Sequence, residues 1–165
     1  MRFRRMATTA LVLGLCLSSG VAAAETVVRV DKTGDAPRGI DIDSARYSYA
    51  GGEVAVTARV QDLQRMGSAS LSITRFEVFE AGYIVRIVKK RGRPAQTALL
   101  YFDHFDATER TCDGVRGRWG RSRIRLVVPT ECLRDHRTSS LFVQFGISDA
   151  GRVDHAPAVV RLQSD

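Results

Sequence analysis

Asparagine is absent from the 165-residue sequence, and lysine is rare, because only Lys32, Lys89 and Lys90 are lysines among 25 basic residues. This bias toward arginine is typical of a GC-rich coding sequence, so the number of arginines does not by itself indicate a function. No serine lies in a G-x-S-x-G motif. The sequence therefore lacks the nucleophile elbow of α/β hydrolases.

Long apolar runs are also missing. The run 10–17 is followed by Ser18, Ser19 and Gly20, and it is much shorter than the ~20 residues of a transmembrane helix. Three arginines precede this run and small residues follow it at 21–24, which is the pattern of a secretory signal peptide. We expect residues 1–24 to be cleaved off near Ala24 and Glu25. The product would be a secreted, single-domain monomer, 25–165, without a transmembrane segment.

Cysteine is scarce, and one of the three, Cys16, lies within the predicted signal peptide. The remaining pair, Cys112 and Cys132, predicts one disulfide in an oxidising compartment. Closing a loop of this length would contribute about 3 kcal/mol in the chain-entropy model. Zinc is disfavoured, because two thiols 20 residues apart with no C-x-x-C pair do not match its usual ligand spacing.

Apolar residues alternate in twos through most of residues 25–165, which predicts an all-β protein. Strands 45–49 and 53–60 are expected to form a hairpin, because Gly51 and Gly52 separate them. A second hairpin is expected to join 76–80 to 83–90 across Ala81 and Gly82, with a bulge or break near Thr74 and Arg75. About nine strands result. Their spacing predicts an antiparallel β-sandwich of jelly-roll or immunoglobulin-like type.

The densest group of acids lies at residues 31–43, where Asp31, Asp35, Asp41 and Asp43 alternate with glycines and a proline. Such a segment can supply the several oxygen ligands that Ca²⁺ needs, although its spacing is not that of an EF-hand. The alternative is an ordinary loop in which each aspartate caps a turn through the backbone.

Basic residues gather in two places, and both are candidate ligand-binding segments. One is Lys89, Lys90 and Arg91, and the other contains Arg118 and Arg121 on either side of Trp119. These clusters suit an anionic cell-wall or extracellular polysaccharide, with the tryptophan stacking on a sugar. The export signal disfavours a nucleic acid partner. The alternative is a solvated surface that reflects coding bias.

Carboxylates beside aromatic residues at 103–109 are the candidate for catalysis. Asp103, Asp106 and Glu109 could supply the carboxylate pair of a secreted glycoside hydrolase. A strand end that runs into a polar loop explains them equally well.

Several short motifs carry a resemblance: Gly34-Asp35 and Asp41-Ile42 before an alternating strand, Cys112-Asp113-Gly114, Val128-Pro129, Cys132-Leu133, and Asp154 before Ala156-Pro157. Together with the signal peptide they resemble small secreted β-sandwich proteins of actinobacteria, a family that implies a fold and no particular activity. More distantly, the chain is similar to carbohydrate-binding and DOMON-like sandwich modules, which implies sugar or haem ligands.

The sequence therefore predicts a non-catalytic secreted or cell-envelope β-sandwich domain that binds an extracellular polymer or carbohydrate, with no cofactor apart from the calcium weighed above. Two alternatives stay open. One is a secreted hydrolase built on the 103–109 segment, and the other is a structural or interaction protein that uses a basic face.

Overall fold

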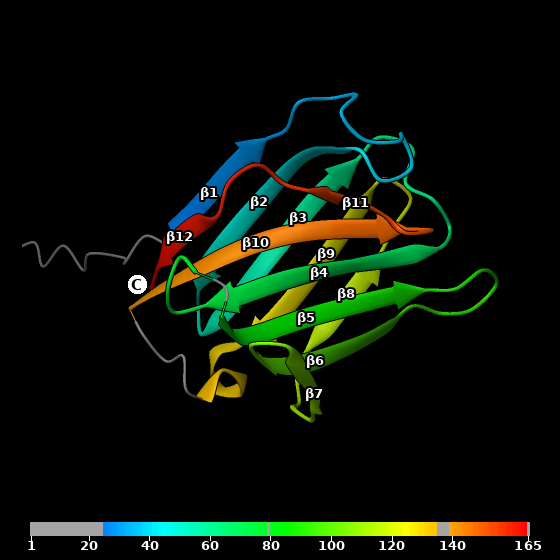
Figure 1. Cartoon of the computed structure of the whole chain (residues 1–165). Helices are drawn as coiled ribbons and strands as arrows, with labels where there is room; N and C mark the ends of the chain where they lie inside the picture. Colours follow the sequence, from blue (N-terminus) through cyan, green and yellow to red (C-terminus); the bar gives the residue numbers. More distant parts are fainter. Residues whose placement is uncertain (1–24, 79, 135–138, 165) are drawn as a thin grey trace, which may run out of the picture.

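The computed structural model describes residues 25–78, 80–134 and 139–164, so the predicted signal peptide lies outside the described residues. The described chain forms two antiparallel sheets that pack face to face (Figure 1). This arrangement confirms the predicted β-sandwich. Among the described residues, no helix has the length and apolar character needed to cross a membrane.

One sheet has five strands in the order β1-β2-β3-β9-β8, and the other has the order β11-β10-β4-β5-β6-β7, with β12 also pairing with β10. The described residues thus hold twelve strands, where the sequence predicted about nine. The five-stranded sheet contains β1 (Glu25–Val30), β2 (Ile42–Ala50), β3 (Glu53–Val60), β8 (Arg116–Trp119) and β9 (Arg123–Pro129). The seven-stranded sheet contains β4 (Gly67–Thr74), β5 (Ala81–Lys89), β6 (Gln96–Asp103), β7 (Asp106–Arg110), β10 (Ser140–Asp149), β11 (Arg152–His155) and β12 (Val160–Gln163).

The two sheets enclose one hydrophobic core, to which alternate residues of their strands contribute. Val54 and Val56 of β3 are fully buried, whereas Thr57 and Arg59, at alternate positions of the same strand, point outward. Tyr47 of β2 and Phe145 of β10 are among the largest fully buried side chains. The backbone N–H of Phe145 donates to the Tyr47 hydroxyl at 3.1 Å, so a hydrogen bond joins the two sheets inside the core.

The first predicted hairpin is confirmed. Ala50 at the end of β2 lies opposite Glu53 at the start of β3, and only Gly51 and Gly52 separate them. Their φ angles of 56° and 73° lie in the left-handed region that favours glycine. The glycine pair therefore sets the register between β2 and β3.

The second predicted hairpin is wrong in its first strand. Strand β4 ends at Thr74, whose hydroxyl donates to the carbonyl of Phe76, and the described residues that follow, 75–78 and 80, are exposed. Gly82 is no turn residue, because it lies inside β5, where a Cβ would come within 2.3 Å of a backbone oxygen of β4. The change of apolar phase near Thr74 thus marks the end of a strand, and no bulge is needed.

The predicted disulfide is present between Cys112, which follows β7, and Cys132, which lies in the 3₁₀ turn η1 (Thr130–Cys132) after β9. Their Cα atoms are 5.8 Å apart. Because β7 and β9 belong to different sheets, the bond ties the sheets together. The backbone N–H of Thr130 donates to the Gly52 carbonyl at 2.8 Å, which places this tie at the β2–β3 turn end of the sandwich.

Candidate functional sites

The outer surface of the five-stranded sheet is rich in arginine. Inward residues of its strands are buried in the core, so the residues that alternate with them point to solvent. We call the arginines at these outward positions, with the one in the β8–β9 turn, the arginine face. Its members are Arg46 of β2, Arg59 of β3, Arg116 and Arg118 of β8, Arg121 of the turn, and Arg123 and Arg125 of β9, all of them exposed.

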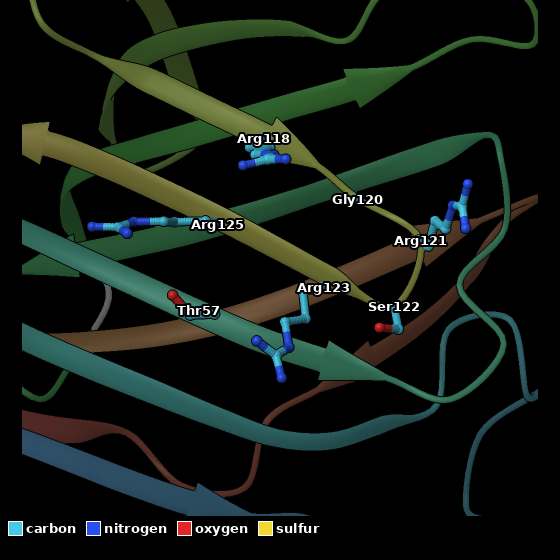
Figure 2. Close-up of a pocket in the computed structure, with 7 residues that line it drawn as sticks. All are labelled: Thr57, Arg118, Gly120, Arg121, Ser122, Arg123 and Arg125. Carbon is cyan, nitrogen blue, oxygen red and sulfur yellow. The ribbon is translucent and has the colours of Figure 1, made fainter.

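Two pairs of these arginines lie directly opposite each other on neighbouring strands. Arg118 is paired in register with Arg125, and Arg59 with Arg123. Figure 2 shows Arg118, Arg123 and Arg125 on the same side of the sheet, with Thr57 among them. Like charges that face each other across an antiparallel pair destabilise a sheet. The register of β9 therefore concentrates positive charge at a cost in stability.

Acids are nearly missing from the same surface. Across the outward positions of β3, β8 and β9, the one acid is Glu53, and both of its carboxylate oxygens accept hydrogen bonds from Arg116 at 2.8 Å. Within the described part of the chain, no ion pair joins Arg118, Arg123 or Arg125 to a carboxylate. Their charges are left to solvent ions or to a ligand.

Four members of the arginine face, with Thr57 and Ser122, border an open depression of about 490 Å³ (Figure 2). The lining offers guanidinium and hydroxyl donors and no carboxylate. Guanidinium groups bind carboxylate, phosphate and sulfate oxygens through paired hydrogen bonds. The depression can therefore hold anionic groups.

The basic residues that the sequence singled out do not all meet here. Arg118 and Arg121 belong to the arginine face, whereas Lys89, Lys90 and Arg91 lie at the end of β5 and in the β5–β6 turn of the other sheet. The sequence did not point to Arg46 and Arg59, which the strand order brings beside β9. The sequence signal that could have identified them is their position in alternating strands, on the side opposite the apolar residues.

Trp119 is not a stacking platform on the arginine face. It follows Arg118 in β8 and so points to the opposite side of the strand, where its side chain packs against the hydrophobic core. Its indole N–H donates to the Gln64 carbonyl at 2.9 Å. A ligand on the outer surface therefore meets arginine and hydroxyl groups, and the tryptophan serves packing.

Two of the four aspartates predicted to bind calcium come together with a third that the sequence did not suggest. Asp35 and Asp41, from the loop between β1 and β2, and Asp154 of β11 each place a carboxylate oxygen within 4.8 Å of the other two. Asp31 lies nearby, and its carboxylate interacts electrostatically with all three. Asp43 is outside this group, in a β2 irregularity between Ile42 and Ser44. We call Asp35, Asp41 and Asp154 the carboxylate cluster.

Backbone amides position these carboxylates. The N–H of Gly34 donates to Oδ2 of Asp41 at 2.8 Å, and the N–H of Ile42 donates to Oδ2 of Asp154 at 2.9 Å. Burial raises the pKa of Asp154 above the usual aspartate value, and repulsion from Asp35 and Asp41 adds to this rise. Burial likewise raises the pKa of Asp31. The cluster is thus a partly buried concentration of negative charge.

The three carboxylates at 103–109 do not all meet on one side of the β6–β7 hairpin. Asp103 and Asp106 are paired across the exposed β6–β7 turn, and Asp103 forms an ion pair with His104 at 2.7 Å. Glu109 is three residues from Asp106 on the same strand, so it points to the other side of β7. These residues form an exposed edge hairpin, and no observation favours the hydrolase hypothesis.

Comparison with models of protein families, with curated proteins and with solved structures found no match for this chain. The arginine face and the carboxylate cluster are therefore interpreted from their own chemistry.

Proposed function

We propose that this chain is a secreted, non-catalytic binding module whose arginine face holds an anionic extracellular polysaccharide. The observation that carries the proposal is the cross-strand register that places Arg118 opposite Arg125 and Arg59 opposite Arg123, where the outward positions of β3, β8 and β9 hold a single acid. Residues that lower stability and have no structural role are expected at functional surfaces. Export is a further part of the proposal, and the Cys112–Cys132 disulfide is compatible with it.

Coding bias does not account for the arginine face. Such bias selects arginine in place of lysine, but it does not remove acids from one surface. The seven-stranded sheet comes from the same coding sequence, and its outward positions include Ser70 and Ser72 of β4 and Gln144 of β10, with the arginines Arg86 of β5 and Arg161 of β12 among them. Arginine is therefore concentrated on one sheet of the sandwich.

The shape of the surface favours a polymer over a small molecule. Small-molecule sites are concave and mostly apolar, whereas the depression beside Arg118 and Arg125 is open and lined by polar groups. Neighbouring strands are about 4.8 Å apart, and alternate residues along a strand are about 6.8 Å apart. The arginines thus form a two-dimensional array, which a chain with repeated anionic groups contacts at several points at once.

The test is affinity electrophoresis of the protein, residues 25–165, in gels that contain a purified wall polymer. A carboxylate-bearing polymer, a phosphate-bearing polymer and a neutral polysaccharide would be compared at about 50 mM and about 500 mM salt. We expect retardation by one or both anionic polymers at low salt, and its loss at high salt. The two anionic arms distinguish the chemistry of the bound group.

A matched pair of variants locates the binding surface. Arg118→Gln with Arg125→Gln is expected to weaken binding about fivefold, because each lost contact is worth about 0.5 kcal/mol. The control, Arg86→Gln with Arg161→Gln, removes the same charge from β5 and β12 of the other sheet and should bind as the wild type does. Equal losses in both variants, or no retardation of the wild type at low salt, would contradict the proposal.

A further inference from the structure

The carboxylate cluster has features that a loop of turn-capping aspartates does not need. Asp41 is 1% exposed and Asp154 is 9% exposed, so both side chains are more than nine-tenths buried. Oδ1 of Asp41 is buried without any hydrogen-bond partner, although its Oδ2 is held by a backbone amide. Buried carboxylate oxygens are rarely left unpaired, because the loss of hydration is costly. This orphaned oxygen belongs to a group whose other members lie within 4.8 Å.

No basic side chain of the described residues forms an ion pair with these carboxylates. Among residues 25–78, 80–134 and 139–164, the ion pairs involve Asp62, Asp103 and Glu53, and none involves a carboxylate of the cluster. Asp31 adds a further carboxylate, whose Oδ2 is also buried and unpartnered. The most buried acids of the described ranges are therefore left without a basic counter-ion in those ranges. Uncompensated buried charge is strongly destabilising, so a cation is expected.

We propose that Asp35, Asp41 and Asp154 bind a calcium ion. Oxygens held 2.3–2.6 Å from one Ca²⁺ can be at most about 5 Å apart, and the cluster meets this limit. The donors are carboxylates, which select hard cations, and no histidine or cysteine belongs to the cluster. Backbone amides fix one oxygen of Asp41 and one of Asp154, as hydrogen bonds to ligating carboxylates do at metal sites.

Calcium is favoured over Mg²⁺ by the number and placement of the oxygens. Ca²⁺ takes 6–8 oxygen ligands in flexible geometry and accepts bidentate carboxylates, whereas Mg²⁺ requires a near-ideal octahedron and keeps several waters. Asp35 is exposed, so one side of the site is open to water, which can complete the coordination shell. Asp31 interacts electrostatically with all three carboxylates, and its buried Oδ2 has no hydrogen-bond partner, so its charge adds to the attraction for a cation.

The site would join the two sheets at one end of the sandwich. Asp41 immediately precedes β2 of the five-stranded sheet, and Asp154 lies in β11 of the seven-stranded sheet (Figure 1). The Cys112–Cys132 disulfide ties the sheets at the other end of β2, beside Gly52. A bound cation would therefore be the non-covalent counterpart of the disulfide. This role does not depend on the proposed binding of polysaccharide.

Calorimetric titration of the chelator-treated protein, residues 25–165, with CaCl₂ and in parallel with MgCl₂ tests the inference. We expect Ca²⁺ to bind with a Kd of about 10⁻⁴–10⁻³ M, the range of extracellular modules, and Mg²⁺ to bind at least about tenfold more weakly. The Tm should rise by about 3–8 °C between chelator and about 10 mM Ca²⁺. No heat of binding and an unchanged Tm would overturn the inference, and equal affinity for Mg²⁺ would overturn the choice of metal.

Variants separate the cluster from the rest of the acidic loop. Asp154→Asn is expected to lower calcium affinity at least about tenfold, whereas Asp43→Asn, an equal charge change outside the cluster, should leave it unchanged. Asparagine preserves the size of the side chain and can still accept the Ile42 N–H. A Tm in chelator at or above that of the wild type would show that Asp154→Asn folds. Equal calcium affinity in both variants would contradict the assigned ligands.

Discussion

The arginine face and the carboxylate cluster are both concentrations of like charge, and they differ in their exposure to water. Arg118 and Arg125 lie opposite each other on an exposed sheet surface, whereas Asp41 and Asp154 are buried at the end of the sandwich. Two unit charges 4 Å apart repel by about 1 kcal/mol in water and by about 4 kcal/mol at an effective dielectric constant of 20. Position, more than charge number, therefore decides how strongly each site needs a ligand.

The consequence for binding is that the two sites suit different partners. Each pair of facing arginines lowers the free energy of unfolding by only tenths of a kcal/mol, so the arginine face is stable without a ligand. Weak contacts repeated along a polymer therefore suit it. The cluster holds a buried oxygen of Asp41 without a partner, and the neighbouring Asp31 holds another, so a single ion of high charge suits it. A change of charge in the interior should therefore alter stability more than a change of charge on the exposed surface.

The largest effect is expected when charge is created in the core itself. Tyr47 is fully buried, and burial raises its pKa to about 12, even though the hydrogen bond from the Phe145 N–H partly offsets this rise. The folded state thus favours the neutral form of Tyr47. The contribution of this preference to the free energy of unfolding is complete below pH 10 and is lost as the pH rises toward 12. We expect the free energy of unfolding to fall by roughly 2–3 kcal/mol over this range.

Urea denaturation of the wild type and of Tyr47→Phe, followed by Trp119 fluorescence from pH 8 to pH 12, measures this effect. The variant should be less stable at pH 8 by about 1–3 kcal/mol, because the Phe145 N–H loses its acceptor. Its deficit should shrink as the pH rises, since it lacks the buried ionising group. A deficit that stays constant from pH 8 to pH 12 would contradict the raised pKa.

The next effect compares the cluster with the arginine face directly. In chelator, Asp41→Asn should raise the free energy of unfolding by about 1–2 kcal/mol, because it removes a buried charge and its amide can donate to a neighbouring carboxylate. Arg125→Gln on the exposed surface should change it by less than about 0.5 kcal/mol. Urea midpoints measured with and without Ca²⁺ check both values. With calcium present, the wild type should become more stable than Asp41→Asn. A variant that is less stable than the wild type in chelator would contradict the claim that the buried charge is the more costly one.

The alternation of residues predicted the strands with one buried and one exposed face, and missed those without that contrast. In β2 and β3, buried residues alternate with more exposed ones, and both strands were predicted. Strand β7 is exposed along its whole length, and β8 and β11 have four residues each. These short or edge strands pair because their neighbours are in place, so their own sequences carry little pattern.

The same distinction applies to the candidate sites. Asp35 and Asp41 were predicted together because they are close in the chain. Asp154 could not be predicted with them, because the β10–β11 hairpin brings it to Ile42 across 112 residues of sequence. The arginine face likewise depends on the crossover that places β9 beside β3, which pairs Arg59 with Arg123. Local spacing can identify suitable residue types, but the sheet order decides which of them meet.

The smallest effect is expected on the exposed arginine face. Arg123→Glu converts the Arg59–Arg123 pair from like to opposite charge, and a favourable cross-strand pair contributes about 0.2–1 kcal/mol. We therefore expect this variant to be more stable than the wild type by about 0.5 kcal/mol, measured as a higher urea midpoint with an unchanged slope. The gain should shrink at high salt, because both residues are exposed.

Arg123→Glu should at the same time bind anionic polysaccharide more weakly than the wild type. A stability gain coupled to a loss of binding is the signature of a surface kept for function. Arg161→Glu on β12 changes charge equally on the other sheet and serves as the control, with no gain in stability and unchanged binding expected. If Arg123→Glu were instead less stable at low salt, the facing arginines would not repel each other as their register implies. The case for a functional arginine face would then lose its main support.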